Sequence, residues 1–271
     1  MKKQRNWRTT VVGLILTAIM LFPLYWMINV SLTPENKLRA DPPPLFPTQP
    51  TFAGYDKVIH EQLPYLGTSF LVGIGTVLVT LIVAAPAGYA LAKLRFRGKR
   101  WALGLIVATL LVPAQVRFVP VFSLLASVGL VNTLTGLILP FGVSALGTFL
   151  VRQALLSVPD AQIEAARIDG ASELYIVYRL LTPLLKPTLV SFFLFSFVSH
   201  WNDYFWPLVL TTDEHARTLP LAIALLREQG TGVRWHLVMA GNVILSLPAL
   251  AVFAAAQRHL LRAVSMRGFG G

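Results

Sequence analysis

A short run of polar and aromatic residues at positions 199–207 contains the side chains best suited to binding a small solute. It reads Ser-His-Trp-Asn-Asp-Tyr-Phe-Trp-Pro and ends a long apolar segment. A carboxylate and an amide can hydrogen-bond to hydroxyl groups, and aromatic rings can cover the apolar face of a sugar. Because polar residues inside a membrane span usually face a bundle interior or a water-filled cavity, the run predicts one wall of a solute pathway. The candidate pathway residues in it are Trp201, Asn202, Asp203 and Tyr204.

A second interpretation of the same run stays open. Aromatic residues also form belts at membrane–water interfaces, and there Asp203 would simply be solvated. Arg117, which interrupts another apolar segment, is a further pathway candidate because it could meet a phosphate group. Its side chain could equally extend to lipid headgroups.

The sequence lacks the residue patterns of common catalytic and metal sites. It has no Gly-x-x-x-x-Gly-Lys-Ser/Thr phosphate loop, since Gly98-Lys99 lacks the upstream glycine and the hydroxyl residue that follows. Its five histidines are scattered without metal-ligand spacing, cysteine is absent, and Ser144 lacks the second glycine of a nucleophile elbow. We therefore expect no enzymatic activity, no metal and no cofactor, so any ATP hydrolysis must come from a partner chain.

The longest polar interruption in the second half of the chain covers residues 157–187, and it predicts two short helices with a corner between them. Ser157 and Asp160 stand at capping-box spacing, and Gly170 is placed to end the first helix in a left-handed turn. Ser172 is placed to cap the second helix. The first helix is expected to have one apolar face, formed by Ala161, Ala165 and Ile168.

The composition is that of an integral membrane protein. The chain is 55% hydrophobic and only 13% charged, whereas a soluble domain carries about 25% charge. Its mean hydropathy is +0.65. The net charge of +11 is therefore better explained by loops at a membrane surface than by nucleic-acid binding.

Six apolar segments predict an all-α protein with six transmembrane helices, at residues 11–32, 62–92, 101–129, 133–151, 188–207 and 237–257. The first is too long for a signal-peptide core and has no small-residue cleavage site, so we expect it to be retained. Residues 33–64 are expected to be an extended external segment and residues 211–236 a polar external loop. The transmembrane domain would then cover residues 11–260, between a basic N-terminal segment at 1–10 and a tail at 261–271.

The distribution of basic residues predicts the orientation. Six spans put both termini and residues 157–187 on one side, and that side holds sixteen of the 23 Lys and Arg residues. Short loops rich in Lys and Arg remain in the cytoplasm. We therefore expect both termini and the polar interruption to be cytoplasmic.

The polar interruption resembles the EAA loop of permease subunits of bacterial ABC importers. Glu164-Ala165-Ala166 is followed at the family's spacing by Gly170 and Pro183, while Leu180 and Thr182 replace the family's Ile and Leu. The resemblance implies a coupling helix between the fourth and fifth spans that docks into a cleft of a cytosolic ATPase. The residues it assigns to docking are Glu164, Ala165, Ala166, Asp169 and Gly170. From the residues alone, an ordinary amphipathic loop on the membrane surface is the competing interpretation.

The resemblance extends over nearly the whole chain and is to the shorter permease of maltose-type and glycerol-3-phosphate-type importers. It implies a second permease, two ATP-binding subunits, an external solute-binding protein and a bacterial cytoplasmic membrane. The implied cargo is a sugar or a polyol phosphate. The alternative is a stand-alone secondary transporter, but such proteins show internal repeats and paired ionisable residues at mid-membrane, and we find neither in this sequence.

Overall fold

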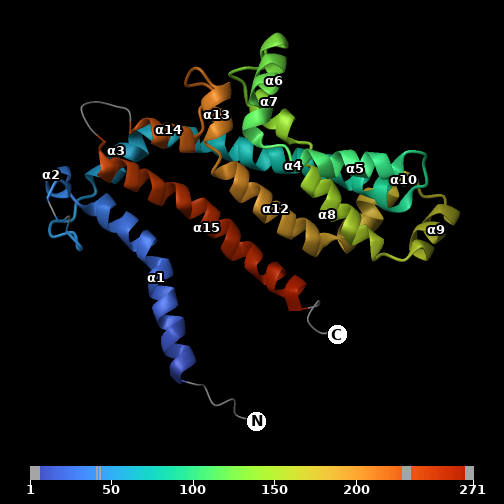
Figure 1. The fold of residues 1–271 in the computed structure, drawn as a ribbon, viewed down its shortest axis with the longest axis horizontal. Coiled ribbons are helices and arrows are strands. Elements are labelled where there is room, and N and C mark those ends of the chain that lie inside the picture. Colours follow the sequence, from blue (N-terminus) through green and yellow to red (C-terminus); the bar gives the residue numbers. More distant parts are fainter. Residues whose placement is uncertain (1–6, 41, 43, 228–232, 266–271) are drawn as a thin grey trace. The chain divides into compact units, whose positions relative to one another are not determined.

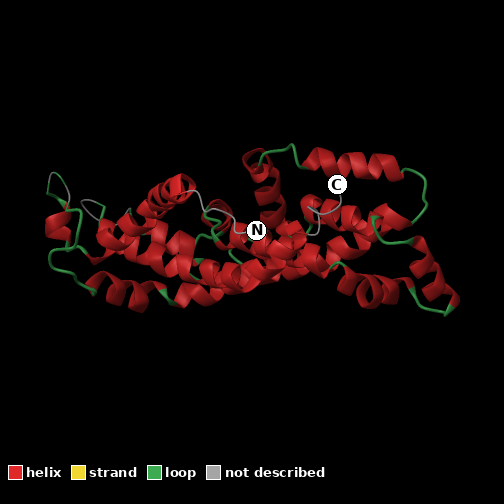
Figure 2. Ribbon diagram, turned by 90° about the horizontal axis from the view of Figure 1, so that it is seen from below, coloured by secondary structure: helices red, strands yellow, loops and turns green. Residues whose placement is uncertain are grey.

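The computed structural model describes residues 7–40, 42, 44–227 and 233–265, with side chains up to Gln257 except that of Ala114. The described residues form helices and loops without a β-strand (Figures 1 and 2). In chain order the helices are α1 (Trp7–Leu32), α2 (Glu35–Leu38), α3 (Ala53–Gln62), α4 (Pro64–Lys93), α5 (Lys99–Thr109), α6 (Ala114–Ser127), α7 (Leu134–Ile138), a 3₁₀ turn (Leu139–Phe141), α8 (Ala145–Leu156), α9 (Asp160–Ile168), α10 (Glu173–Tyr175), a π-helix (Ile176–Leu181), α11 (Thr182–Leu184), α12 (Lys186–Trp201), α13 (Phe205–Leu210), α14 (Leu219–Leu225) and α15 (Trp235–Ser265). The all-α prediction is confirmed.

Three described helices are long and apolar enough to cross a membrane: α1, α4 and the 235–257 part of α15. Two bent pairs raise the number to five if each pair is one span. The first joins α7 and its 3₁₀ turn to α8 at 43°, and the second joins residues 173–184 to α12 at 84°. The six-helix count therefore stays a prediction.

The third expected span, residues 101–129, is not one helix. It is divided into α5 and α6 by a break that ends at Pro113, the residue that precedes α6 in an extended conformation. Proline lacks an amide donor and disfavours helix at the residue before it, so a break at this point is the expected consequence.

The fourth and fifth expected spans are also broken. Ser144 interrupts the fourth, and its side chain caps α8 by accepting a hydrogen bond from the amide of Gly147. The fifth ends as a regular helix at Trp201, and Asn202 closes it. The two segments that were expected to be external contain helices that were not predicted, α2 and α3 in residues 33–64 and α14 in residues 211–236.

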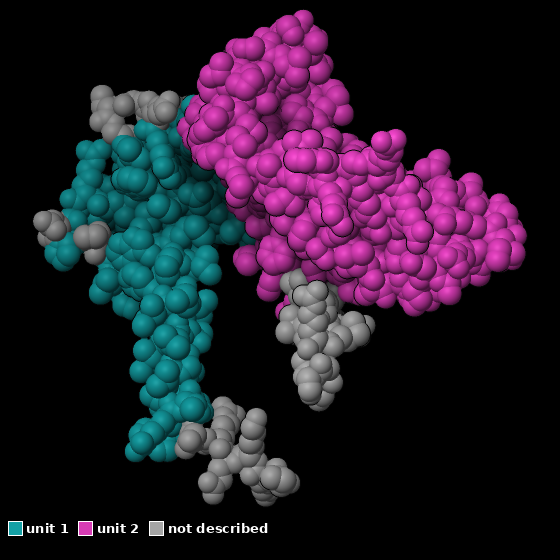
Figure 3. Space-filling model, turned by 45° about the vertical axis from the view of Figure 1, so that its right-hand side comes forward, with its two compact units in different colours: residues 1–65, 221–248 teal, residues 66–220, 249–271 magenta. Residues whose placement is uncertain are grey.

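The chain divides into two compact units, coloured separately in Figure 3. Unit 1 comprises residues 1–65 and 221–248. Within it, the end of α1 is fixed to residues 33–64, because Asn29 donates to the Pro44 carbonyl at 2.9 Å and Ser31 shares a 2.6 Å hydrogen bond with Tyr55. Gly54 lets α3 approach the backbone of His236, which lies 3.4 Å from the position that a Cβ would take.

Unit 2 comprises residues 66–220 and 249–271, and it contains all the candidate site residues. One of its hydrophobic clusters joins α4, α8, α9 and the π-helix, and its buried members include Ala84, Tyr89, Val151, Leu155, Ile163, Ile176, Val177 and Leu181. Small residues permit this close packing. A Cβ added at Gly88 would lie 2.6 Å from Val151, so α4 and α8 meet at a distance that only glycine allows.

Candidate functional site

The first helix of the predicted coupling loop is α9, and its start is fixed by a lysine rather than by a capping box. The residue before α9 is Pro159, which provides no side-chain cap, and the Ser157 hydroxyl donates instead to the Ala154 carbonyl at 2.7 Å. The capping-box prediction is therefore wrong. Lys93, the last residue of α4, donates through Nζ to the Val158 carbonyl and to Asp160 Oδ1, both at 2.6 Å.

This contact changes the acidity of Asp160. The hydrogen bond from Lys93, followed by the positive charges of Lys93 and Arg95, holds the pKa of the Asp160 carboxyl below its ordinary value. The ionised form of the carboxyl is thus the one that attaches α9 to the end of α4.

The face of α9 that packs inward is not the apolar face formed by Ala161, Ala165 and Ile168. Ile163 is the buried residue, at 2% exposure, and Ala166 packs partly against the same cluster. Ala161, Ala165 and Ile168 are exposed, and Ile168 is 86% exposed. A helix this short packs only one face against the protein. The alanine-rich stripe of α9 is therefore exposed and accessible to a partner backbone.

The corner between the two helices has the predicted conformation. Gly170 has a left-handed φ of +80°. The amide of Ala171 donates to the Ala166 carbonyl at 2.9 Å and the amide of Gly170 to the Arg167 carbonyl at 3.0 Å, which together form a Schellman motif. Ser172 then accepts a hydrogen bond from the Tyr175 amide and caps the second helix, as predicted.

A hydrogen-bonded triad attaches the corner to α4. Arg167 Nε donates to Glu173 Oε1 at 2.8 Å, and an Arg167 terminal nitrogen donates to the Tyr89 hydroxyl at 3.0 Å. The Tyr89 hydroxyl itself donates to Glu173 Oε2 at 2.5 Å. Tyr178, in the π-helix, adds a further bond to α4 by donating to the Ile82 carbonyl at 2.8 Å.

Three of the five predicted docking residues line one open cleft of about 610 Å³ beside this corner: Ala166, Asp169 and Gly170. Ala171, Ser172, Tyr175 and Leu180 complete its lining. Glu164 and Ala165 lie on the exposed side of α9. In the part of the chain that the structure describes, the Glu164 carboxylate forms no ion pair, so it is available to a donor on another chain.

The predicted pathway residues lie at the break between α12 and α13. Asn202 ends α12, and its side-chain amide nitrogen donates to the Val198 carbonyl at 2.9 Å. Asp203 accepts a hydrogen bond from the Trp206 amide at 3.3 Å and so starts α13. Tyr204 and Asn202 are exposed.

Trp201 lies elsewhere than predicted, because it is part of the core of unit 2. Its side chain is 1% exposed, with ring centres 4.7 Å from Phe70 and 5.5 Å from Phe197. It supports the break and does not present a face to a solute. Arg117, on α6, is exposed, and Asp203 forms no ion pair with it or with another described residue.

Asn132 holds the start of the 211–236 loop through hydrogen bonds that were not predicted from the sequence. Asn132 is the one described non-glycine residue with a positive φ, at +63°. The Asn132 side-chain nitrogen donates to the Asp213 carboxylate, and the side-chain oxygen accepts a hydrogen bond from the backbone amide of Thr212 at 3.2 Å. The backbone amide of Asn132 donates to the Leu210 carbonyl at 2.7 Å. Asn tolerates left-handed backbone better than other non-glycine residues, and a lone Asn after Gly129 was the available signal.

Long apolar helices with a polar corner between two bent helix pairs are the architecture of a multi-pass membrane protein. The chain belongs to the family of binding-protein-dependent transport system inner membrane components, which it matches over residues 84–266. The resemblance found in the EAA loop is thereby confirmed.

Individual relatives agree with this family. The chain is 30% identical to the arabinooligosaccharides transport system permease protein AraQ of Halalkalibacterium halodurans, over 98% of this chain and 97% of the relative. It is also 30% identical to the sn-glycerol-3-phosphate transport system permease protein UgpE of Yersinia enterocolitica, with 93% and 92% covered.

Solved structures share the fold. One chain of a bacterial ABC transporter that imports the acidic polysaccharide alginate superposes with a TM-score of 0.78 at 26% identity, covering 95% of this chain and 98% of that one. The inward-facing MetNI methionine ABC transporter shares the fold at 19% identity and a TM-score of 0.58, over 77% of this chain and 98% of that one.

Proposed function

We propose that the chain is the permease subunit of an ATP-driven importer that takes a carbohydrate from an external binding protein across the bacterial cytoplasmic membrane. The observation that carries this proposal is the corner at Gly170: an exposed stripe on α9 is held rigidly against α4 by Lys93, Tyr89 and Arg167. A surface loop without a partner has no need of such fixation.

The structure supports a route by which motion at α9 reaches the membrane helices. Ile163 connects α9 to the cluster that contains Tyr89 of α4 and Ile176 of the π-helix. The π-helix continues through α11 into α12, which ends at the candidate pathway residues. A displacement of α9 by an ATPase subunit would therefore move α4 and α12 together, as coupling between distant sites requires.

We assign docking of the ATPase to Glu164, Ala165, Ala166, Asp169 and Gly170. Small side chains on the exposed stripe let a partner backbone approach closely. The free Glu164 carboxylate suits charge-assisted hydrogen bonds from basic groups. The partner complex would comprise two ATP-binding subunits, a second permease and the binding protein, with both termini of this chain in the cytoplasm.

For the cargo we favour an uncharged sugar or oligosaccharide over a polyol phosphate. Asp203 is half-buried beside Tyr204 and has no cationic partner among the described residues, so it would repel a phosphate. Asn202 and Asp203 offer hydrogen-bonding groups for sugar hydroxyls, and Tyr204 offers an aromatic face. The named relatives transport arabinooligosaccharides, glycerol phosphate and alginate, which is a range that includes both alternatives.

Exchange of the coupling residues tests the proposal. Glu164→Ala and Gly170→Val should lower solute uptake and co-purification of the ATPase subunit, while the amount of chain in the membrane stays unchanged. Gly98→Val is the matched control, because Gly98 also has a left-handed φ, +85°, and no heavy atom near the position of an added Cβ. Normal transport by both loop variants would contradict the docking assignment.

A further inference from the structure

We propose that the loop between α4 and α5 binds the anionic headgroups of membrane phospholipids. This segment, here called the basic loop, comprises residues 93–101, from the last residue of α4 through the connection into the first turn of α5, and reads Lys-Leu-Arg-Phe-Arg-Gly-Lys-Arg-Trp. It contains five basic residues and no acidic one. The proposal is independent of the cargo and of the ATPase.

Two lysines of the basic loop turn inward and fix its shape. Lys99 Nζ donates to the carbonyls of Ala92 and Leu94, at 3.1 and 3.0 Å, which caps the C-terminal end of α4. Lys93 Nζ donates to the Val158 carbonyl and to Asp160 Oδ1. Gly98 makes the left-handed turn that leads into α5. The loop backbone is thus held at both ends before any ligand binds.

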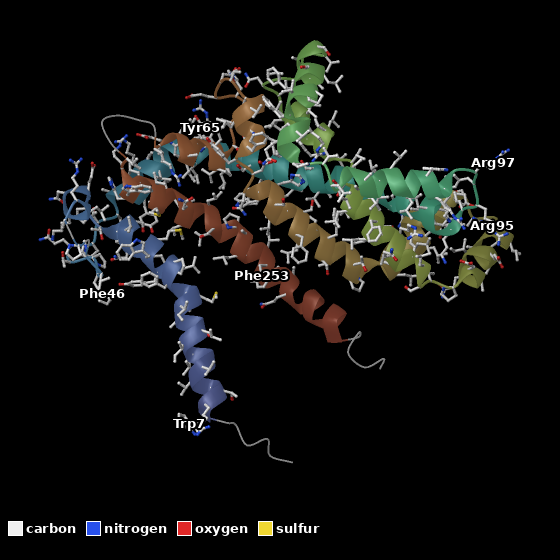
Figure 4. All side chains as sticks on the ribbon, viewed as in Figure 1. Trp7, Phe46, Tyr65, Arg95, Arg97 and Phe253 are labelled. Atoms are coloured by element: carbon white, nitrogen blue, oxygen red, sulfur yellow. The ribbon has the colours of Figure 1, made fainter. Side chains whose placement is uncertain are left out.

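The three arginines of the basic loop turn outward instead. Arg95, Arg97 and Arg100 are exposed, and Figure 4 shows Arg97 pointing away from the ribbon. Arg97 and Arg100 have no ion pair or hydrogen bond from their side chains to a described residue. Arg95 is near enough to Asp160 to lower the pKa of that carboxyl. Each of these guanidinium groups presents donors matched to phosphate oxygens.

Exposed aromatic rings alternate with these arginines. Phe96 is 44% exposed and Trp101 is 81% exposed. An aqueous surface disfavours such rings, whereas the boundary between headgroups and acyl chains accommodates them. Basic residues interleaved with aromatic ones therefore fit a lipid surface better than an acidic protein.

The position of the basic loop also points to lipid. It directly follows α4, a 30-residue helix with the composition of a membrane span. A helix of that length extends about 45 Å, which exceeds the roughly 30 Å of the hydrocarbon layer. The helix is thus long enough for its end at Lys93 to extend past this layer, and near a membrane surface each basic side chain raises the affinity for anionic lipid about fivefold.

Quenching of Trp101 fluorescence by brominated lipids tests the proposal with the full chain in lipid nanodiscs. The Trp101 signal is the difference between the wild-type protein and Trp101→Phe, an exchange at an exposed position. Brominated phosphatidylglycerol and brominated phosphatidylcholine are compared at the same mole fraction. We expect phosphatidylglycerol to be enriched about fivefold or more beside Trp101. The enrichment should be lost at 1 M salt, where the screening length is about 3 Å.

Two triple variants make the result specific. R95Q/R97Q/R100Q should abolish the enrichment, whereas K37Q/R39Q/K57Q removes the same charge from the predicted external side and should leave it unchanged. Equal quenching by both lipids, or enrichment that persists in the arginine variant, would overturn the proposal. So would an arginine variant that keeps its lipid preference but no longer binds the ATPase subunit, because the basic loop would then serve a protein partner.

Discussion

Arg167 and Glu173 face each other across the left-handed corner at Gly170, with 2.8 Å between Arg167 Nε and Glu173 Oε1. The same guanidinium group reaches the Tyr89 hydroxyl at 3.0 Å. The Arg167 side chain therefore joins α9 and α10 to the long apolar helix α4. This arrangement connects the loop to α4 by side-chain hydrogen bonds, as the proposed coupling role requires.

We predict that breaking this pair loosens the corner without unfolding the chain. Both side chains are about half exposed, so the pair itself contributes only about 0.2–1 kcal/mol. Arg167→Gln should raise amide hydrogen exchange at residues 169–173 several-fold, as measured by mass spectrometry. Lys57→Gln is the matched control, since the Lys57–Glu61 pair on α3 is similarly exposed. Unchanged exchange in Arg167→Gln would mean that the corner is held by its backbone alone.

Two isoleucines of α9 should separate stability from docking. Ile163→Ala removes a buried side chain from the cluster with Tyr89 and should cost about 2–5 kcal/mol, which a thermal unfolding scan would detect. Ile168→Ala alters a side chain that is 86% exposed and should leave the unfolding temperature unchanged. It should nonetheless weaken binding of the ATPase subunit. The account would fail here if Ile168→Ala had the larger effect on stability.

Gly170 and Gly98 allow conformational strain to be distinguished from function. An alanine at either position meets no heavy atom within 4 Å but is forced into a left-handed backbone. That conformation costs about 1–2 kcal/mol. The two variants should therefore have similar unfolding temperatures, and only Gly170→Ala should reduce ATP-driven uptake. Equal loss of uptake in both would indicate general destabilisation.

The contact between Lys93 and Asp160 should be lost only in acid. Because the pKa of the Asp160 carboxyl is lowered in the folded chain, its stabilising effect is present above the ordinary pKa of about 3.9. It disappears as the pH falls through the lower, folded-state pKa. The rate of trypsin cleavage after Arg167, divided at each pH by the rate for an unstructured reference peptide because trypsin itself slows in acid, should be unchanged between pH 8 and 6. Asp160→Asn should increase cleavage over that whole range, and cleavage that varies with pH there in the wild-type chain would contradict the assignment.

Local residue patterns predicted part of this site. The all-α class, the left-handed Gly170 and the Ser172 cap follow from neighbours in the sequence, and the structure has all three. The hydrogen bonds to α4 could not be predicted from local patterns, since Lys93 and Asp160 are 67 residues apart and Tyr89 and Glu173 are 84 apart. No short pattern encodes such pairs.

The wrong predictions have the same origin. The apolar spacing on α9 placed Ala161, Ala165 and Ile168 on one face, but which face packs inward is decided by tertiary packing, and the buried residue is Ile163. Hydropathy alone joined α5 to α6, although Pro113 separates them. Trp201 looked like a ligand platform because aromatic residues serve both in cores and in binding sites, and only its burial against Phe70 separates the two roles.

Labelling of a single cysteine on α9 tests the central claim, that α9 docks into an ATPase, most directly. The chain has no cysteine of its own, so Ile168→Cys introduces a unique and exposed thiol. The account predicts rapid modification by a maleimide in membranes with the permease alone and strong protection once the ATPase subunits are assembled. Leu208→Cys, at an exposed position on α13, should be modified equally in both preparations. Equal modification of Ile168→Cys with and without the ATPase would contradict the account.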